Sequence, residues 1–363
     1  MRIAILGTRG IPARYGGFET FAEELSTRLA LVGHSVTVYC RTKHPEPAYH
    51  GVRLRYLPTI RHKYLDTPAH TLLSTIDLIF HRSDVALYCN AANAIFTIVP
   101  RVLGMPVVLN VDGIERKRQK WNRIAKFWYR VSEKLATLLP NAVVSDAQAI
   151  ADYYRARYGK ATHFIPYGAE LGKVATTAVL DELNLQPGRY FLYVSRMEPE
   201  NHALEVRQAF EKVKTEMKLA LIGDAPYAAD YIRRVRETSD PRIVIPGAIY
   251  GVGYQELGSH CFAYIHATTV GGTHPALIEA MGRGALVLYR DTEENAEVAV
   301  GAGIAFGEHD LAEKLAQALA MSEAERDDFR RRAAERVRDR YSWDAVTADY
   351  ERLFRELVRP ARR

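Results

Sequence analysis

Short runs of apolar residues alternate with helix-length amphipathic segments along the whole chain. The runs are rich in Val, Ile, Leu and Tyr, which is typical of strands that are buried on both faces of a parallel sheet and connected by helices. This order therefore predicts an α/β fold. We expect strands over 2–6, 35–40, 53–57, 85–89, 106–110 and 142–145, and in a second series over 190–195, 218–223, 242–247, 262–267 and 285–289.

The two series of strands predict two doubly wound, Rossmann-like domains, which also suits a chain of 363 residues. Residues 168–189 have no strand pattern and include Pro187–Gly188, so we expect an N-terminal domain over 1–170 and a C-terminal domain over 186–341. Ligands of doubly wound sheets bind at the carboxyl ends of the strands, which predicts a site in a cleft between the domains. Helical patterns close the sequence over 309–320, 322–340 and 342–358.

Composition narrows the class of protein. Hydrophobic residues make up 48% and charged residues 25% of the chain, as in soluble globular proteins. No apolar stretch reaches the length of a membrane span, and a strand begins at residue 2, which leaves no room for a signal peptide. The three cysteines, at 40, 89 and 261, are widely spaced among apolar residues. We expect them to be reduced core residues of a cytoplasmic protein.

The loop after the first strand is the most informative segment. Residues 3–20 read IAILGTRGIPARYGGFET, a strand, a glycine-rich loop and the start of a helix. Such a loop places backbone N–H groups and a helix N-terminus where an anionic group can bind. It is about twice as long as a dinucleotide-binding loop and carries Arg9, Arg14 and Glu19. We therefore expect it to close over a substrate.

Arg196 follows the strand at 190–195 directly, in the sequence SRMEPEN. A guanidinium at the carboxyl end of a buried strand is well placed to neutralise a diphosphate. The alternative is a structural ion pair with Glu198 or Glu200.

A second glycine-rich loop, VGGTHPALIEAMGR, spans residues 270–283. Its glycines and Thr273 permit close backbone approach and are expected to cap a helix that can hold phosphate. Glu279 lies in an otherwise apolar run about two turns into this helix and can accept two ribose hydroxyls. The alternative is a solvated helix residue. His266 and His274 lie close by, but without the spacing of metal ligands, so we expect no metal site.

Asp112 and Gly113 follow the strand at 106–110, with Glu115 two residues further on. An Asp–Gly pair is often a plain turn, but this one follows a strand that ends at the expected cleft.

Residues 114–130 carry seven Lys or Arg and one Glu, interleaved with two Trp, a Phe and a Tyr, in a chain of net charge +6. The segment is either a solvated helix face or an interfacial helix that meets anionic lipid. Nucleic acid is the weakest option, because no nucleic-acid-binding motif accompanies the charge.

Together these segments resemble the retaining GT-B glycosyltransferases of the family-4 type. More narrowly, they are similar to bacterial rhamnosyltransferases that build polysaccharides on a lipid carrier. Residues 342–354, SWDAVTADYERLF, resemble the closing helix that crosses back to the first domain. The other matching stretches are GTRGIPARYGGFET, NVDGIERKRQKW, FIPYGAE, SRMEPEN and GGTHPALIEAM, within roughly residues 1–300.

Three positions depart from the pattern of these families. Gly271 stands where the broad family has a Glu, eight residues before Glu279. Asn201 stands where it usually has a Lys, five residues after Arg196. Since one cation is absent, Arg196 would carry more of the charge of the leaving group. Arg116 also stands where the narrower subgroup tends to have Trp.

The resemblance implies transfer of L-rhamnose from dTDP-L-rhamnose, with retained configuration, to a lipid-linked saccharide. UDP-GlcNAc or another UDP or GDP sugar remains an alternative donor. A nucleotide-sugar epimerase of the same fold and a non-enzymatic binding module are alternative functions. In the front-face mechanism of such enzymes, the departing phosphate and the incoming hydroxyl share one side of the sugar. No protein nucleophile, metal or cofactor is then needed.

The resemblance also assigns residues to roles. The expected partners are the nucleotide sugar, the acceptor and an anionic membrane. The enzyme is expected to work at the inner face of that membrane and to contact it through 114–130. No nucleic acid is expected, and the oligomeric state stays open. The candidate catalytic residues are Arg196, Asp112 and Glu279. The candidate donor contacts are Arg196, Asn201, Gly271, Gly272, Thr273, His274, Glu279, Asn295 and Glu297. The candidate acceptor contacts are Arg9, Arg14, Tyr15, Gly16, Gly17, Glu19, Glu115 and Lys117.

Overall fold

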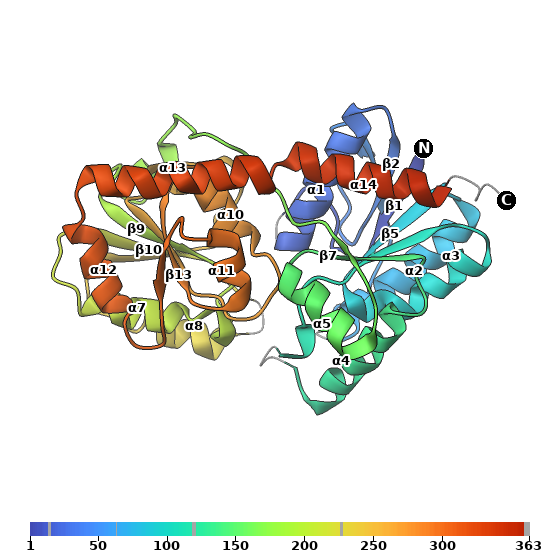
Figure 1. Cartoon of the computed structure of the whole chain (residues 1–363), viewed down its shortest axis with the longest axis horizontal. Coiled ribbons are helices and arrows are strands. Elements are labelled where there is room, and N and C mark those ends of the chain that lie inside the picture. Colours follow the sequence, from blue (N-terminus) through green and yellow to red (C-terminus); the bar gives the residue numbers. More distant parts are fainter. Residues whose placement is uncertain (14–15, 63, 118–120, 226–227, 359–363) are drawn as a thin grey trace. The chain divides into compact units, whose positions relative to one another are not determined.

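The computed structural model divides the chain into two units, which are described separately (Figure 1). Unit 1 comprises Met1–Tyr167 and Trp343–Arg363, and unit 2 comprises Gly168–Ser342. The structure describes residues 1–13, 16–62, 64–117, 121–225 and 228–358. The side chain of Lys117 also lies outside the description.

Unit 1 is built on one sheet with the strand order β3-β4-β2-β1-β5-β6-β7-β8. All neighbouring strands are parallel except β3 and β4, which are antiparallel. The strands are β1 (Arg2–Leu6), β2 (Ser35–Cys40), β3 (Ala48–Tyr49), β4 (Val52–Tyr56), β5 (Val85–Cys89), β6 (Val107–Asn110), β7 (Ala142–Ser145) and β8 (His163–Phe164).

Helices cover both faces of this sheet, because its central strands are apolar on both sides. The helices are α1 (Gly17–Leu31), α2 (Asp66–Phe80), α3 (Ile98–Val102), α4 (Arg123–Ala136), α5 (Gln148–Tyr158) and α14 (Trp343–Val358), with the short 3₁₀ helices η1 (Ala91–Thr97) and η2 (Glu115–Lys117). Helices α2, η1, α4 and α5 share one buried cluster with the strands. Helices α1 and α14 pack against each other on the opposite face (Figure 1).

Helix α14 belongs to unit 1 although it lies at the end of the sequence. The ring of Tyr350 packs 5.4 Å from Phe21 of α1, and Phe21 packs 5.3 Å from Tyr167, measured between ring centroids. The Tyr350 hydroxyl also accepts a hydrogen bond of 2.9 Å from Asn110 at the end of β6. The last helix is therefore part of the core of unit 1.

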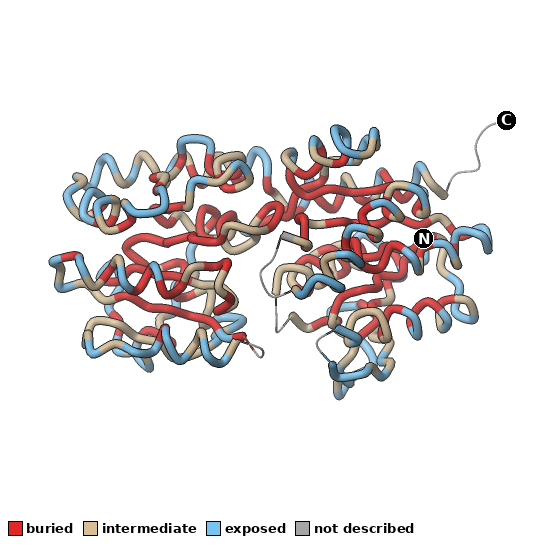
Figure 2. The backbone as a smooth tube through the Cα atoms, turned by 90° about the horizontal axis from the view of Figure 1, so that it is seen from below, coloured by how far each residue is buried: buried red, intermediate tan, exposed pale blue. Residues whose placement is uncertain are grey.

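Unit 2 is built on an all-parallel sheet with the strand order β11-β10-β9-β12-β13-β14. The strands are β9 (Tyr190–Val194), β10 (Lys218–Ile222), β11 (Ile243–Gly247), β12 (Ala263–His266), β13 (Leu286–Arg290) and β14 (Ile304–Phe306). The helices are α6 (Ala178–Glu182), α7 (Ala203–Glu211), α8 (Ala229–Arg236), α9 (Gly251–His260), α10 (Pro275–Gly282), α11 (Glu293–Ala299), α12 (Leu311–Ala320) and α13 (Glu323–Arg340), with the 3₁₀ helix η3 (Pro199–Asn201). In Figure 2 the strands of both units are mostly buried, whereas their helices are exposed on their outer sides.

The predicted fold class is confirmed, and each predicted strand has a counterpart. The pattern missed β3, β8 and β14, which are two or three residues long and therefore too short for an apolar run. The prediction of one helix over 114–130 is wrong. Residues 115–117 form η2, and α4 begins at Arg123, because the Asn122 side chain accepts a hydrogen bond from the Ala125 N–H and caps it there.

Candidate functional site

The carboxyl ends of β1 and β5 lie side by side in the sheet of unit 1. From β1 the sheet continues on one side through β2, and from β5 it continues on the other side through β6. This is the switch point at which doubly wound sheets bind ligands. Burial first, then the nearby carboxylates of Glu19 and Asp112, raise the pKa of Cys89 at the end of β5. The structure thus brings two of the predicted site residues to the same place.

Two glycines of the opening loop have no room for a side chain. Gly7 has φ +91°, and a Cβ on it would lie 2.4 Å from the carbonyl oxygen of Cys89. Gly10 has φ +101°, and a Cβ there would lie 2.6 Å from the Cβ of Cys40. Both positions need glycine for its backbone conformation and its size, so the loop runs tightly over the ends of β5 and β2.

Two carboxylates one turn apart on α1 hold the loop. The Arg9 N–H donates a 2.9 Å hydrogen bond to Glu19, and the Ala13 N–H donates a 2.5 Å hydrogen bond to Glu23. Only 6% of Glu19 is exposed. The carboxylate of Glu19 positions the loop, and its predicted contact with the acceptor stays a prediction. Glu23 was not predicted at all.

The opening loop ends at the N-terminus of α1, and its Arg9 side chain lies near an ion pair formed by another arginine, Arg41. Gly16 is the extended N-cap residue of α1, and Gly17 is its first residue. The Arg9 guanidinium lies 3.8 Å from Asp66, which also pairs with the buried Arg41 at 2.8 Å. Arg14 and Tyr15, two predicted acceptor contacts, lie outside the described residues.

Asp112 has a left-handed backbone with φ +53°. Its N–H donates to the Asn110 side-chain oxygen at 3.0 Å, and its carboxylate accepts a 3.4 Å hydrogen bond from the Tyr167 hydroxyl. Burial, and then Asp112, raise the pKa of Tyr167 well above its usual value. Asp112 is therefore fixed from both its main chain and its side chain, and it is only partly buried.

The residues after Asp112 are tied to α4. Glu115 is 8% exposed and accepts a 3.4 Å hydrogen bond from the indole of Trp121. Arg116 donates to Glu133 at 3.0 Å and to the Tyr153 hydroxyl at 2.8 Å. Arg116 thus has a structural ion pair where the related subgroup tends to have Trp. The side chain of Lys117 lies outside the description.

The corresponding switch point of unit 2 lies between β9 and β12. Arg196 follows β9 and its guanidinium lies 3.9 Å from Glu198, with 27% of its side chain exposed. Asn201 donates a 2.6 Å hydrogen bond to the Arg196 carbonyl and is 2% exposed. Asn201 therefore shapes the loop that presents Arg196.

The loops that follow β9 and β12 are joined by Thr269. Its N–H and its hydroxyl both donate to the Glu200 carbonyl, each at 3.1 Å, and its hydroxyl lies 3.2 Å from His202 Nε2. No pattern in the sequence marks this junction, because the partners are far apart along the chain. It fixes the loop that carries Arg196 against the glycine loop.

The imidazole of His274 fills the space beside Gly271 that a side chain at this position would need. A Cβ on Gly271 would lie 2.2 Å from His274 Nε2. No carboxylate can therefore extend from position 271 while His274 holds this position. This explains in physical terms why glycine stands where the broad family has Glu.

Asn295 fixes the orientation of His274. The Asn295 amide donates hydrogen bonds of 3.0 Å to the carbonyls of Thr268 and Arg290, so its oxygen must face His274 Nδ1 at 2.8 Å. Nδ1 consequently carries a proton and donates it. Asn295 is fully buried. Asn295 therefore positions His274, and its predicted contact with the donor stays a prediction.

Burial also shapes the rest of the glycine loop. His266 lies beneath His274, with 4.8 Å between ring centroids, and burial holds its pKa well below the usual value. Gly272 and Thr273 are buried. The expected cap at Thr273 is wrong, since α10 begins at Pro275 with His274 as the residue before it.

Glu279 lies about one turn into α10, nearer its start than predicted, because the helix begins at Pro275. Its carboxylate accepts a 2.5 Å hydrogen bond from Tyr254 of α9. Desolvation, and then this carboxylate, raise the pKa of Tyr254. Tyr254 was missed because it lies on another helix. Glu297, also predicted as a donor contact, is half-buried on α11, and its carbonyl accepts a 2.9 Å hydrogen bond from Arg336.

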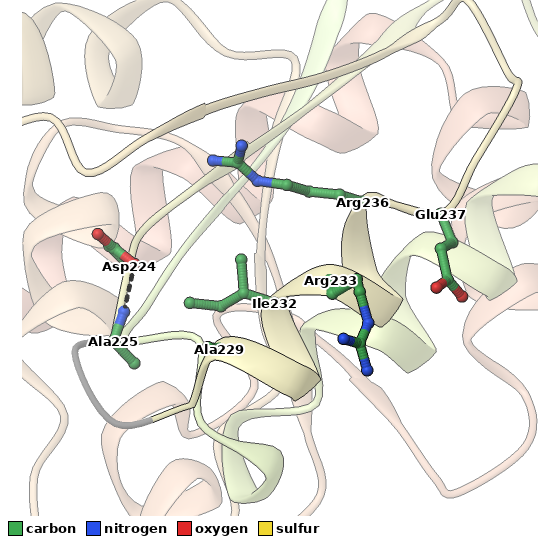
Figure 3. A pocket seen from close by; sticks show the side chains of 7 residues that line it. All are labelled: Asp224, Ala225, Ala229, Ile232, Arg233, Arg236 and Glu237. Atoms are coloured by element: carbon green, nitrogen blue, oxygen red, sulfur yellow. Dashed lines mark hydrogen bonds between the residues drawn. The ribbon is translucent and has the colours of Figure 1, made fainter.

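A hollow of about 610 Å³ lies beside the end of β10 and α8. In Figure 3 Asp224 and Ala225 form one side, joined by a 2.7 Å hydrogen bond from the Ala225 N–H to the Asp224 carboxylate. The side chains of Arg233, Arg236 and Glu237 diverge from one another there. Because its charged groups do not converge, the hollow is not the site predicted from the sequence.

The described part of the chain contains no group of three or more His, Cys, Asp or Glu placed to bind a metal ion. Nor does it contain a helix with the length and apolar character that crossing a bilayer requires.

Two Rossmann-like units in one chain define the class of GT-B proteins. Residues 15–173 match the family described as Glycosyltransferase Family 4, and residues 188–322 match the one described as Glycosyl transferases group 1. The chain is accordingly a GT-B glycosyltransferase of the family-4 type. Comparison with curated proteins gives no match.

Solved structures confirm the fold over the full length. Sucrose-phosphate synthase from Thermosynechococcus elongatus is 19% identical, with a TM-score of 0.76 and 98% of both chains covered. HepE of Anabaena in complex with UDP and glucose is 15% identical, with a TM-score of 0.79, covering 98% of this chain and 100% of its own. WaaG, a glycosyltransferase involved in lipopolysaccharide biosynthesis, is 15% identical, with a TM-score of 0.71, covering 96% and 99%.

Proposed function

We propose that this glycosyltransferase moves L-rhamnose from dTDP-L-rhamnose, with retained configuration, to a lipid-linked saccharide in the synthesis of a cell-surface polysaccharide. The observation that carries the proposal is Arg196 at the switch point of unit 2. Its guanidinium stays partly exposed beside a loop fixed by Asn201 and Thr269. A cation held in this position suits the diphosphate of a nucleotide sugar.

Unit 2 is proposed to bind the donor. The solved structures of HepE with UDP and with UDP-glucose show that a protein of the same fold binds a nucleotide sugar. In this chain Glu279 would accept the ribose hydroxyls, as its hydrogen bond with Tyr254 fixes the carboxylate. The narrower donor assignment is supported by GTRGIPARYGGFET and GGTHPALIEAM, which resemble the rhamnosyltransferase subgroup.

Unit 1 is proposed to bind the acceptor through the opening loop and Asp112. In the reaction, the bond from the anomeric carbon to the phosphate oxygen breaks and a bond to the acceptor hydroxyl forms on the same side. The hydroxyl proton passes to the departing phosphate, and Arg196 stabilises the charge on that phosphate. We propose that no metal takes part, so activity should survive an excess of EDTA.

The donor site is tested by two arginines at opposite ends of one strand. Arg196 follows β9 and Arg189 precedes it. Arg196→Ala is expected to weaken dTDP binding in calorimetry about tenfold or more, because a charge-assisted hydrogen bond is lost. Arg189→Ala should bind as the wild type does. Unchanged affinity in Arg196→Ala would show that the assigned phosphate site is wrong.

The sugar is tested by a panel of donors. Thermal shift and hydrolysis are measured with dTDP-L-rhamnose, UDP-GlcNAc and a GDP sugar. The largest stabilisation is expected with dTDP-L-rhamnose, because at equal concentration the ligand with the lowest dissociation constant stabilises the folded state most. Preference for UDP-GlcNAc would revise the donor only. Release of free sugar with no transfer to any acceptor would favour an epimerase.

The enzyme is also proposed to contact the membrane through 114–130, at the inner, cytoplasmic face. The cations of this segment include Arg123, Lys126 and Arg130 of α4, of which Arg123 and Arg130 are exposed. Cations on an exposed helix are attracted to anionic lipid. Lys117, Arg118 and Lys120 belong to the same proposal but lie wholly or in their side chains outside the described residues.

A further inference from the structure

Three adjacent helical segments of unit 1 expose large apolar side chains. Helix α4 contacts η1, which continues into α3, and α2 contacts both η1 and α3. These segments lie wholly within the described residues and cover one face of the sheet (Figure 1). Their exposed apolar residues are Leu72 (46%), Leu73 (39%), Ile76 (44%) and Phe80 (78%) on α2, Ile95 (38%), Ile98 (42%) and Val102 (73%) on η1–α3, and Ile124 (79%), Phe127 (65%) and Trp128 (37%) on α4. We call this set the three-helix surface.

The spacing shows that these side chains point away from the sheet. Leu72, Ile76 and Phe80 are four residues apart and form one stripe on α2. Leu78 of the same helix is buried in the cluster that packs on the sheet, as are Ala94 of η1 and Ala136 of α4. Each helix therefore has a buried inner stripe and a second apolar stripe on its outer side. Monomeric proteins rarely expose large contiguous apolar patches without a binding role.

The acidic side chains on these helical segments all form ion pairs, whereas the basic side chains of α4 do not within the described part of the chain. The acidic residues of these segments are all paired with arginines from elsewhere: Asp66 with Arg41, Asp77 with Arg55, and Glu133 with Arg116. The basic residues of α4 form no ion pair within the described part of the chain. They are Arg123, Lys126, Arg130 and Lys134.

We propose that the three-helix surface binds an anionic lipid bilayer, with the outer stripes of α2, η1–α3 and α4 in the headgroup region and the cations of α4 on lipid phosphates. Apolar stripes combined with unpaired cations and aromatic side chains are what an interfacial helix presents to such a membrane. A protein partner or a second copy of this surface would need acids opposite the four cations. The surface itself offers none unpaired, so it does not complement a copy of itself.

This inference deepens the membrane contact of the proposed function, because it assigns most of the contact to α2 and α3, far from 114–130 in the sequence. Its test uses no sugar, so its failure leaves the donor assignment standing. Binding of the full chain is measured by co-sedimentation with vesicles of phosphatidylglycerol and phosphatidylcholine, and with phosphatidylcholine alone. The wild type is expected to bind the anionic vesicles at low salt, and less at high salt.

Two double variants divide the surface. Phe80→Ser with Val102→Ser removes exposed apolar area from α2 and α3, and Ile124→Ser with Phe127→Ser removes it from α4. Each is expected to weaken vesicle binding about tenfold or more, because the lost apolar area no longer enters the bilayer. The matched control is Leu31→Ser with Val32→Ser, since these residues are 83% and 59% exposed at the end of α1, on the opposite side of the sheet.

The variants are compared only where circular dichroism and the melting temperature match the wild type. Equal vesicle binding by the α2–α3 variant and the control would overturn the proposal. So would equal binding of the wild type to neutral and anionic vesicles. A change in oligomeric state in light scattering, with vesicle binding unaffected, would assign the surface to a second copy and also overturn it.

Discussion

The two switch points hold their loops with different chemistry. In unit 1 carboxylates do this work: Glu19 and Glu23 hold the amides of the opening loop, and Asp112 lies beside them. In unit 2 the corresponding loops are held by neutral groups, the amide of Asn295 and the hydroxyl of Thr269. Arg196 lies at that second site with part of its side chain exposed.

This difference agrees with the partners proposed for the two sites. Carboxylates can orient the hydroxyl of an acceptor, whereas a cation with neutral holders suits the diphosphate of a donor. The same architecture thus holds its loops in two ways, one suited to each proposed ligand.

Asp112→Asn is expected to lower kcat about a hundredfold, because a carboxylate that orients the acceptor hydroxyl is lost and a misplacement of about 1 Å has an effect of that order. Asn tolerates the left-handed backbone of position 112 and keeps the side-chain size. Steady-state kinetics with donor and acceptor measure the effect, and dTDP affinity serves as the control that should not move. If kcat is unchanged, the acidic character of this site has no part in the reaction.

Gly7→Ala is expected to destabilise the protein by about 3 kcal/mol or more, because the new Cβ meets a backbone carbonyl and φ is positive. The carbonyl belongs to β5 and cannot yield without disturbing the sheet. Chemical denaturation measures the free energy of unfolding. Gly33→Ala is the matched control, since Gly33 also has a positive φ but has no atom within 4 Å of an added Cβ.

Gly271→Ala is expected to cost less, about 1–2 kcal/mol, because the neighbour is an imidazole that can rotate away. Rotation would break the hydrogen bond between His274 and Asn295. The double variant Gly271→Ala with His274→Ala should therefore be destabilised by less than the sum of the two single variants. Additive effects in denaturation would mean that the imidazole does not occupy the space.

Stability is expected to fall as the pH decreases from about 6.5 toward 4, through one buried imidazole in each unit. Burial, and then Arg41, lower the pKa of His70 to about 4, and burial holds the pKa of His266 far below its usual value. The unfolded chain binds these protons first, so each group removes up to about 1.4 kcal/mol per pH unit below its unfolded pKa. The stability of His70→Gln should depend less steeply on pH in this window; an identical slope would contradict the assignment.

Thr269→Val is expected to have the smallest effect, about 1 kcal/mol, because the hydroxyl contacts with the Glu200 carbonyl and His202 are lost while the shape and the N–H hydrogen bond are kept. Its main result should be a higher KM for the donor with a nearly unchanged melting temperature, as the Arg196 loop becomes less ordered. Thr67→Val, which removes a hydroxyl contact with Arg41 in unit 1, is the control for donor binding.

Much of the fold could be predicted because buried parallel strands leave a clear apolar pattern. The ends of those strands also located Asp112, Arg196 and the glycine loop. The start of α4 is hard to predict, although Asn122 is a common N-cap residue, because cations on both sides of Asn122 favour one continuous helix in the sequence. The sequence could not show that Glu19 turns back onto a loop amide or that Asn295 is fully buried. Both depend on contacts between segments, and polar residues of the same type occur on surfaces and in cores.

The placement of Tyr350 in unit 1 has a consequence for biosynthesis. During translation the residues of β1 to β8 leave the ribosome first, and α14 leaves last, after the whole of unit 2. At ordinary elongation rates the interval is on the order of ten seconds or more. Throughout that time Phe21 lacks one of its two aromatic partners, the ring of Tyr350, and Asn110 lacks the hydroxyl that accepts its hydrogen bond. Asp112, which is held by Asn110, is fully supported only when synthesis is complete, so the switch point of unit 1 is unfinished in the nascent chain.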